Sequence, residues 1–149
     1  MERDLEYRLY KEELSIAPVS KRVLAFVLDK LLLALIVFAA MGGRFEGKDL
    51  QGVVAALNQA IVFTTVVEIC YQAIFTKLYG ATIGKMLLKI RVVDMELLDN
   101  PGWRYSFLRA AVRFLGETLF YLGFLWAFFD KYRQGWHDKA AKTLVLDGR

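Results

Sequence analysis

The chain has 149 residues, of which 56% are hydrophobic and 24% are charged, and its 20 basic and 16 acidic side chains give a net charge of +4. This length suits one compact unit, and the hydrophobic share exceeds the roughly 45–50% of an ordinary soluble domain, so a membrane protein is expected. A single cysteine, Cys70, excludes an intramolecular disulfide and a cysteine-based zinc cluster. The basic residues flank apolar segments, which favours a role in membrane orientation over nucleic-acid binding.

A polar arm, residues 1–20, precedes the first apolar run. Its acidic and basic residues are interspersed with Leu5, Leu9 and Leu14. This pattern predicts a short cytoplasmic arm, with a helix at the membrane surface as one form that it can take. We expect residues 21–146 to form one membrane domain and residues 147–149 a short tail.

Two apolar runs are long enough to cross a bilayer, which requires about 20 residues. The first span is predicted over 23–41, because a start after Lys30 would leave only 31–41. The second span is predicted over 53–75. The fold class expected from these runs is an α-helical integral membrane protein with two secure transmembrane helices.

A small β-element is predicted on the cytoplasmic surface, over about 86–105 together with 143–146. Residues 88–93 alternate in a period of two that is typical of a short strand, and Asp99 to Gly102 reads as a turn. The apolar run at 143–146 can supply the partner strand.

A third membrane segment is predicted over 107–129, with Ser106 as the cap of its helix. Its apolar part is short for a full span and contains Glu117. Two forms remain open: a full crossing, or a re-entrant hairpin that bends near Tyr121 to Gly123 and is covered by protein.

Charge predicts the orientation of the spans. The loop after the first span carries only Arg44 and Lys48, whereas seven basic residues follow the second span: Lys77, Lys85, Lys89, Arg91, Arg104, Arg109 and Arg113. Cytoplasmic loops are rich in such residues, so the N-terminus and the long loop are expected in the cytoplasm. A crossing third segment would place the basic tail outside, and the hairpin would keep it inside.

Charged residues inside the spans predict a buried polar layer. Arg22 and Asp29 are two turns apart on one helix face, with Asp29 about 10 Å deeper at about 1.5 Å per residue. Glu68 reaches a similar depth in the second span. Because a lone charge at the centre of a span costs about 2.5–3.5 kcal/mol, these groups are expected to meet partners. Lys30 is the cation inside the layer, and Arg22 and Arg113 can reach it from the rim. The candidate residues of this layer are Asp29, Lys30, Glu68, Gln72 and Glu117.

The polar layer has two interpretations, which the sequence leaves open. Its members can be ion pairs that fix the packing of the helices. Alternatively, desolvated carboxylates with raised pKa values can exchange a proton for a cation. Acidic residues outnumber Lys30 in the predicted layer, which favours a cation over an anion.

Other motifs give little support for an enzyme, a metal centre or a cofactor site. The loop motif Gly80, Thr82, Gly84 and Lys85 is one residue short of a phosphate-binding loop and has Met86 where a hydroxyl is needed, so a tight turn is expected. His137 is the single histidine, and beside Asp138 it is expected to be structural.

Four stretches together resemble the RDD family of bacterial integral membrane proteins. They are the Arg22 and Asp29 pair, GATIGKMLLKIRVVD after the second span, LRAAVRF in the third segment and WHDKAAKTLVL near the end, and they cover residues 18–146. The family is named for one arginine and two aspartates, which by motif position correspond to Arg22, Asp29 and Asp138. The resemblance implies a small multi-pass protein of the bacterial inner (plasma) membrane.

The resemblance also bears on function, because sodium/proton antiport has been proposed for some members of the family. The first hypothesis is therefore cation/proton exchange that uses Asp29 and Glu68, in a homo-oligomer, with a monovalent cation, a proton and the lipid bilayer as partners. The second is a non-transporting membrane module that assembles with or regulates a partner protein. In either case Asp138 is expected to pair with Arg22 and tie the tail to the first helix.

Overall fold

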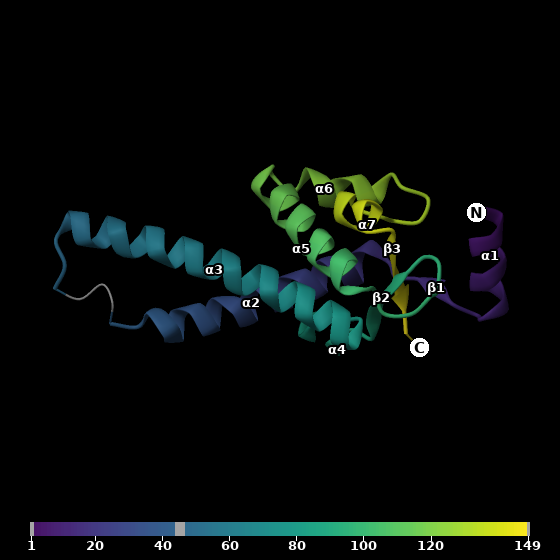
Figure 1. Cartoon of the computed structure of the whole chain (residues 1–149), viewed down its shortest axis with the longest axis horizontal. Helices are drawn as coiled ribbons and strands as arrows, with labels where there is room; N and C mark the ends of the chain where they lie inside the picture. Colours follow the sequence, from purple (N-terminus) through teal and green to yellow (C-terminus); the bar gives the residue numbers. More distant parts are fainter. Residues whose placement is uncertain (1, 44–46, 149) are drawn as a thin grey trace.

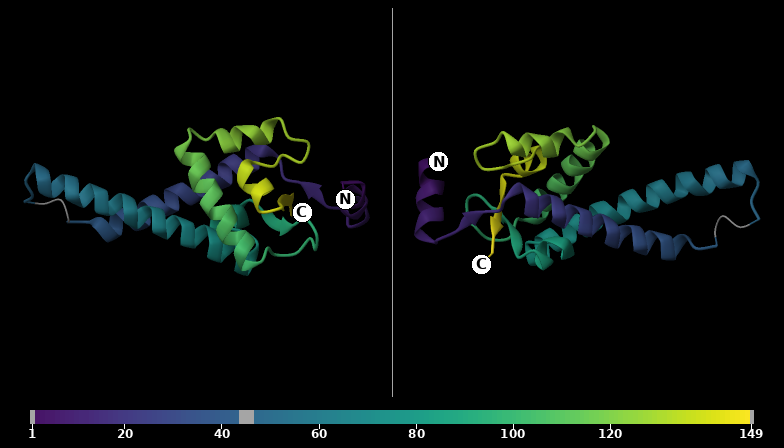
Figure 2. Two further views of the ribbon diagram at one scale, coloured as in Figure 1. Left: turned by 45° about the horizontal axis from the view of Figure 1, so that its top comes forward. Right: turned by 180° about the vertical axis from the view of Figure 1, so that it is seen from behind.

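A long helical hairpin projects from a head that is built on a small sheet (Figure 1). The computed structural model describes residues 2–43 and 47–148. The basic residue Arg44, which entered the prediction of orientation, lies outside this part of the chain, as do Met1 and Arg149. Figure 2 shows from two further sides that the hairpin and the first helix lie at opposite ends of the molecule.

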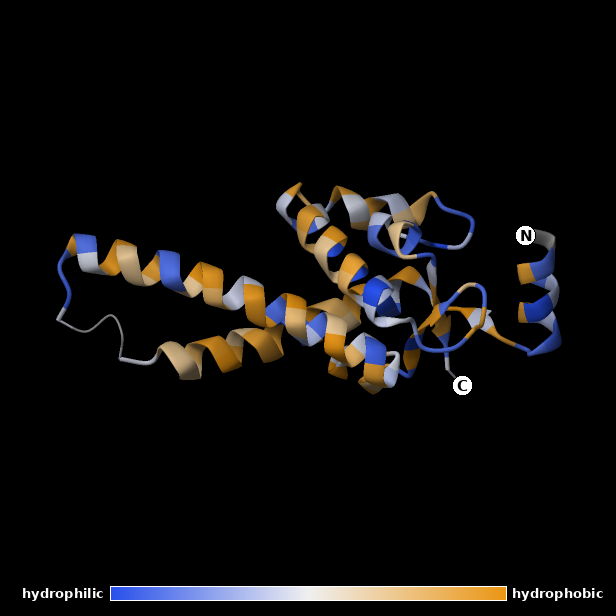
Figure 3. Cartoon of the chain, viewed as in Figure 1, coloured by the Kyte–Doolittle hydropathy of each residue, from blue (hydrophilic) through white to orange (hydrophobic). Residues whose placement is uncertain are grey.

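The hairpin consists of α2 (Val19–Met41) and α3 (Leu50–Tyr79). At about 1.5 Å per residue, helices of 23 and 30 residues measure about 34 and 45 Å, enough for a hydrocarbon core of about 30 Å. Both are long and apolar enough to cross a membrane, and they contain the two stretches predicted as spans. Figure 3 shows that α2 is apolar along the part that leaves the head.

The third segment is bent instead of straight. It comprises α5 (Trp103–Thr118), α6 (Leu122–Leu125) and a 3-10 turn, η1 (Trp126–Phe128), with an angle of 109° between its two halves. Phe120 and Tyr121 have φ values of 55° and 61° and reverse the chain where a bend was predicted.

The start of α5 corrects one prediction. Ser106 is not the N-cap, because the helix begins at Trp103 after Gly102. The Ser106 side chain is buried in the first turn, where its hydroxyl donates a hydrogen bond of 3.5 Å to the carbonyl of Pro101.

The sheet contains β1 (Ser15–Ile16), β2 (Ile90–Asp94) and β3 (Thr143–Asp147) in the antiparallel order β1-β3-β2. Val92 lies opposite Val145 in the register of β2 and β3. These two strands match the predicted pair, whereas the two-residue β1 carries no alternation from which it could be predicted. A short helix, α7 (Trp136–Ala140), leads into β3.

The sheet restricts the topology of the third segment. β1 precedes α2, β2 follows α3, and β3 follows the bent segment. Because one sheet joins them, these three parts of the chain lie on one face of any bilayer that α2 and α3 cross. A crossing third segment would carry β3 to the other face, so the sheet favours the re-entrant hairpin.

Apolar side chains pack on both faces of the sheet. On one face Leu5 and Leu9 of α1 (Glu2–Lys11) pack in a cluster with Val93, Leu144 and Leu146. On the other face Ala25 of α2 belongs to a cluster with neighbouring sheet residues. The N-terminal arm is therefore part of the core of the head.

Close packing of α4 (Ile83–Leu87) against α2 depends on one glycine. A Cβ atom on Gly84 would lie 2.3 Å from the backbone oxygen of Ala25. Backbone cannot move aside as the end of a side chain can, so a larger residue would push the two helices apart.

We expect Gly84→Ala to lower the free energy of unfolding by about 1–3 kcal/mol through overpacking. Thermal unfolding of the purified protein in detergent measures this change. Gly42→Ala is the matched control, because a Cβ atom there meets its nearest neighbour at 3.6 Å. Equal melting temperatures of the two variants would contradict the close packing.

Candidate functional site

Charged side chains converge where the hairpin enters the head. The charged and histidine side chains buried within the described residues are Arg22, Asp29, Glu68, Lys85, Arg109, Arg113, His137 and Asp138. Lys30 and Glu117 are half-buried beside them. The predicted single polar layer divides into three networks, each with its own set of helices.

The first network joins α2, α3 and α5. The ammonium group of Lys30 lies 2.5 Å from Oε1 of Glu68 and 2.6 Å from Oε2 of Glu117. Nε of Arg113 donates to the other oxygen of Glu117 at 3.0 Å. Glu68 and Glu117, which come from different helices, therefore share the ammonium group of Lys30. Glu117 also binds a second cation, Arg113.

Gln72 extends this network along α3. Nη1 of Arg113 donates to Oε1 of Gln72 at 3.2 Å. Arg113 also lies over the rings of Phe26 and Phe124, 5.2 and 5.3 Å from their centroids. Aromatic faces attract a cation and exclude water, so this guanidinium is fixed in a dry environment.

The second network is centred on Asp29 and differs from the prediction. Its Oδ1 accepts hydrogen bonds from the Tyr71 hydroxyl at 2.7 Å and the backbone N–H of Gly84 at 2.8 Å. Its Oδ2 accepts from the Thr82 hydroxyl at 2.6 Å. Asp29 shares no hydrogen bond or ion pair with Glu68 within the described residues. Its three donors make it a cap for the start of α4.

The loop motif surrounds this cap. Gly80 ends α3 with a left-handed φ of 67°, and a Cβ atom there would lie 2.4 Å from the Asn100 side chain. Thr82 and Gly84 bind Asp29, and the Lys85 ammonium donates to the Thr82 hydroxyl at 3.2 Å. The motif is a turn that docks on α2, and the short helix within it was not foreseen.

The third network contains Asp138. Its carboxylate forms ion pairs with Arg22 of α2 and Arg109 of α5, and it accepts the N–H of Gly135 at 2.9 Å. Arg109 also donates to the Thr143 hydroxyl at 2.5 Å. The expected pair of Arg22 and Asp138 is therefore confirmed. Arg109 is a second partner that the sequence analysis did not identify.

Two titratable groups in this network are strongly perturbed. Burial alone would raise the pKa of Asp138, but the charges of Arg109 and Arg22 outweigh it and hold that pKa well below its usual range. Burial, followed by the charges of Arg109 and Arg113, lowers the pKa of His137 well below its ordinary value, although Asp138 opposes them. His137 is therefore neutral at pH 7, and its ring packs 4.9 Å from that of Phe124.

The balance of charge differs from the expected acidic excess. The described residues of the three networks bring together five basic side chains and four carboxylates: Arg22, Lys30, Lys85, Arg109 and Arg113 with Asp29, Glu68, Glu117 and Asp138. A spacing of four residues along α5 places Arg109, Arg113 and Glu117 on one face. Arg113 was expected to reach the polar layer, and the same spacing is the signal from which Arg109 could have been assigned to the buried site.

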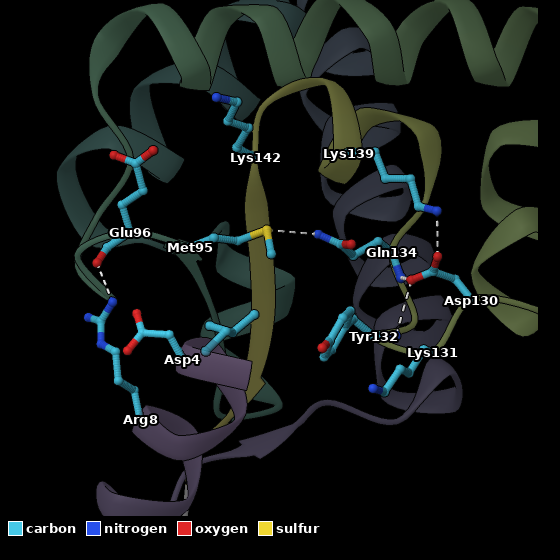
Figure 4. A pocket seen from close by; sticks show the side chains of 11 residues that line it. Asp4, Arg8, Met95, Glu96, Asp130, Lys131, Tyr132, Gln134, Lys139 and Lys142 are labelled. Atoms are coloured by element: carbon cyan, nitrogen blue, oxygen red, sulfur yellow. Dashed lines mark hydrogen bonds and ion pairs between the residues drawn. The ribbon is translucent and has the colours of Figure 1, made fainter. Parts of the chain in front are cut away.

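Two hollows lie near the networks. A groove of about 420 Å³ between α2 and α3 reaches Lys30 and Glu68 between apolar side chains. A pocket of about 470 Å³ lies beside α1 in the head (Figure 4). Charges of both signs line this pocket, and some are paired there, as Lys139 is with Asp130 at 2.5 Å. Among the described residues, no group of three His, Cys, Asp or Glu side chains could hold a metal ion.

Comparison with known proteins gives a consistent result. The model of the RDD family matches residues 16–142. An uncharacterized protein of Rickettsia prowazekii is 31% identical over 90 residues, which are 60% of this chain and 50% of the relative. The uncharacterized membrane protein YteJ of Bacillus subtilis is 31% identical over 85 residues, 57% of this chain and 51% of the relative. The chain spans about half the length of these curated relatives, and no solved structure matches it.

We expect Asp138→Asn to lower the free energy of unfolding by about 3–5 kcal/mol, because two buried arginines lose their counter-charge. Limited proteolysis of residues 130–148 and thermal unfolding measure the change. Asp99→Asn is the matched control, since that side chain is 79% exposed. If residues 130–148 are cleaved no faster in Asp138→Asn than in the control, the proposed role of the ion pairs of Asp138 is contradicted.

The same residue makes stability depend on pH. Because its pKa is lowered on folding, Asp138 contributes stability in full above its unfolded pKa of about 3.9, and this is lost as the pH falls toward the folded value. Asp138→Asn is expected to flatten the acid limb of the stability profile below about pH 4.

Proposed function

The chain belongs to the RDD family, whose model matches residues 16–142, and on that premise we propose that it exchanges a monovalent cation for a proton at Lys30, Glu68 and Glu117. The observation that carries the proposal is the position of the Lys30 ammonium between two carboxylates, at 2.5 and 2.6 Å. Carboxylate oxygens that hold an ammonium group can also hold a metal cation of the same charge. No covalent catalysis is part of this proposal.

Competition between Lys30 and the cation couples the two ions. When Lys30 is protonated, its charge occupies the site and no second cation is needed. When Lys30 releases its proton, the two carboxylates lose their partner, and a monovalent cation restores the charge. One proton therefore leaves for each cation that binds, and the net charge of the site is the same in both states.

The groove between α2 and α3 supports this assignment. It ends at Lys30 and Glu68, and the Lys30 side chain is 34% exposed while that of Glu117 is 9% exposed. The site is therefore approached from the side of Lys30, whereas Glu117 is held from the other side by Arg113. Asp29 is assigned a structural role in this proposal, because three donors already satisfy its carboxylate.

Orientation is part of the proposal. We place the sheet and α1 in the cytoplasm of a bacterial cell and the α2–α3 turn on the far side of the inner membrane. The basic residues of the head support this, because Lys21, Arg91, Lys131 and Lys139 are all partly or fully exposed there. Both termini then face the cytoplasm.

A second candidate function is a non-transporting module that binds a membrane partner or a second copy of the chain. The exposed apolar side chains of the hairpin favour it, since Phe38 is 80% and Ile61 is 64% exposed. Lipid covers such side chains as well as a protein partner does, so this observation is weaker than the geometry at Lys30.

We expect reporters fused to either terminus to report a cytoplasmic location, and a reporter inserted after Lys48 to report the opposite side. The reason is that one sheet joins β1, β2 and β3, which lie before α2, after α3 and after the bent third segment. A C-terminal reporter on the outer side would contradict the re-entrant third segment.

The exchange is tested with purified protein in liposomes under an imposed pH gradient, with Na⁺, K⁺ and Li⁺ added in turn. We expect cation-dependent proton flux in the wild type and in Glu96→Gln, which changes an exposed carboxylate of the head. Glu68→Gln should reduce the flux at least about tenfold, since a neutral amide removes one of the two charges and a loss of 1.4 kcal/mol already gives this factor.

Lys30→Arg is the variant that tests the competition between Lys30 and the cation most directly. Arginine keeps the positive charge between the carboxylates but does not release its proton, because its pKa lies above about 12. We therefore expect a folded protein without exchange. Flux retained in Lys30→Arg would overturn the competition mechanism, and no flux with any cation in the wild type would overturn exchange in favour of the second candidate.

Asp29→Asn separates the structural carboxylate from the proposed site. It should lower the melting temperature, because an amide cannot accept from all three donors at the start of α4. The flux per folded molecule should remain. A stable Asp29→Asn variant without flux would place Asp29 in the exchange site.

A further inference from the structure

The groove between α2 and α3 contains a polar side chain in addition to the ion pair at its end. Among the described residues that line the groove, Thr64 contributes a hydroxyl, Lys30 and Glu68 contribute the charges, and the others are apolar, such as Leu33 and Val37. Hard cations are bound in proteins through oxygen atoms. An oxygen in an otherwise apolar groove that leads to Glu68 therefore lies where an entering cation needs a ligand.

The hydroxyl group of Thr64 has its proton committed and its acceptor side free. Oγ1 donates to the backbone carbonyl of Ala60, one turn earlier in α3, at 2.7 Å. A hydroxyl has one proton and two lone pairs, so the lone pairs remain available after this bond is made. No described residue donates a hydrogen bond to Thr64, which is half-buried at the wall of the groove.

The bond to Ala60 does not by itself indicate a ligand. Threonine side chains in helices often bond to the carbonyl four residues earlier, and Thr118 does so with Phe114 at 3.0 Å. Thr118 is exposed and does not line the groove. What distinguishes Thr64 is therefore its place in the groove, next to the carboxylate at the end.

Glu68 has an oxygen that is available to a ligand. Both oxygens of the other three carboxylates in the networks, Asp29, Glu117 and Asp138, accept hydrogen bonds. Glu68 holds Lys30 at 2.5 Å through Oε1, and its Oε2 accepts no hydrogen bond from any described residue. Since Glu68 lines the groove, a cation can reach this carboxylate without first displacing a donor of the protein.

The spacing along α3 brings the two oxygen-bearing side chains together. Thr64 and Glu68 are four residues apart, so they lie on one face of the helix with Cβ atoms roughly 5–6 Å apart. Both line the same groove of about 420 Å³. Thr64 is the nearer of the two to the α2–α3 turn, so a cation that moves along the groove toward Lys30 passes Thr64 first.

We propose that Thr64 binds the exchanged cation directly, with its hydroxyl oxygen as a neutral ligand beside the carboxylate of Glu68, and that it favours Na⁺ over K⁺. This inference rests on the proposed exchange and adds a residue that determines its ion specificity. Release of the proton from Lys30 frees Oε1 of Glu68, so the cation then has two carboxylate oxygens and one hydroxyl oxygen. A smaller cation approaches each oxygen more closely and gains more from it, which is why the added ligand favours Na⁺.

The first test measures the half-saturating Na⁺ concentration of proton flux in liposomes for Thr64→Val, in which a methyl group replaces the hydroxyl. We expect this concentration to rise about tenfold, the factor given by a loss of about 1.4 kcal/mol, with an unchanged maximal rate. The half-saturating concentration of K⁺ should rise less. Thr64→Ser retains the hydroxyl and should behave as the wild type.

Thr65→Val is the matched control for this assay. It makes the same chemical change one residue further along α3, at a side chain that does not line the groove. We expect it to leave the half-saturating Na⁺ concentration unchanged. An equal rise in Thr65→Val, or a wild-type value in Thr64→Val, would overturn the role of Thr64 and leave exchange at Lys30, Glu68 and Glu117 in place.

The second test measures binding without transport. It compares the melting temperature of the purified full chain in sodium chloride with that in choline chloride of equal concentration, at alkaline pH, where Lys30 releases its proton more readily. We expect Na⁺ to raise the melting temperature of the wild type and of Thr64→Ser, and Thr64→Val to need about ten times more Na⁺ for the same rise.

The two tests together separate this inference from the proposed exchange. A sodium-dependent rise that is weakened in Thr64→Val, in a protein without flux, would support the ligand and overturn the exchange. Flux that is indifferent to Thr64→Val would overturn the ligand alone. The absence of any sodium-dependent rise in the wild type would also overturn the ligand.

Discussion

The whole head depends on the pairing of one buried carboxylate, Asp138, with two arginines from different helices. Arg22 comes from the first turns of α2 and Arg109 from the middle of α5, whereas Asp138 lies in α7 just before β3. Any one of these groups would be costly to bury alone. Their pairing therefore fixes where α2, the bent third segment and the C-terminal strand meet.

The parts of the fold that repeat a simple pattern could be predicted from the sequence. Long apolar runs gave α2 and α3, alternation gave β2, and the two-turn spacing of Arg22 and Asp29 placed both on the buried face of α2. The pair of Arg22 and Asp138 could be expected only through the family resemblance, since 116 residues separate the partners. The two-residue β1 and the five-residue α4 depend on tertiary contacts and have no period of their own.

The sequence analysis placed five residues in one polar layer, whereas in the structure Asp29 belongs to a different network from Lys30, Glu68, Gln72 and Glu117. Depth along a helix can be counted from the sequence, whereas the direction of a side chain around the helix depends on which neighbour packs there. Asp29 and Lys30 are adjacent in sequence and differ by about 100° around α2. One therefore faces α4 and becomes a cap, and the other faces α3 and α5 and meets two carboxylates. Arg109 went unassigned because counting basic residues for orientation treats it as a surface charge.

The order of strands in the sheet also bears on how the protein is made. β3 follows β1 and β2 in the chain but lies between them in the sheet, so the central strand leaves the ribosome after both of its partners. The hairpin of α2 and α3 can enter the membrane while the head is still open, with the edges of β1 and β2 unpaired. Synthesis of residues 138–147 then supplies Asp138 and the missing strand together. Closure of the head in this way has to wait until both α7 and β3 have been made.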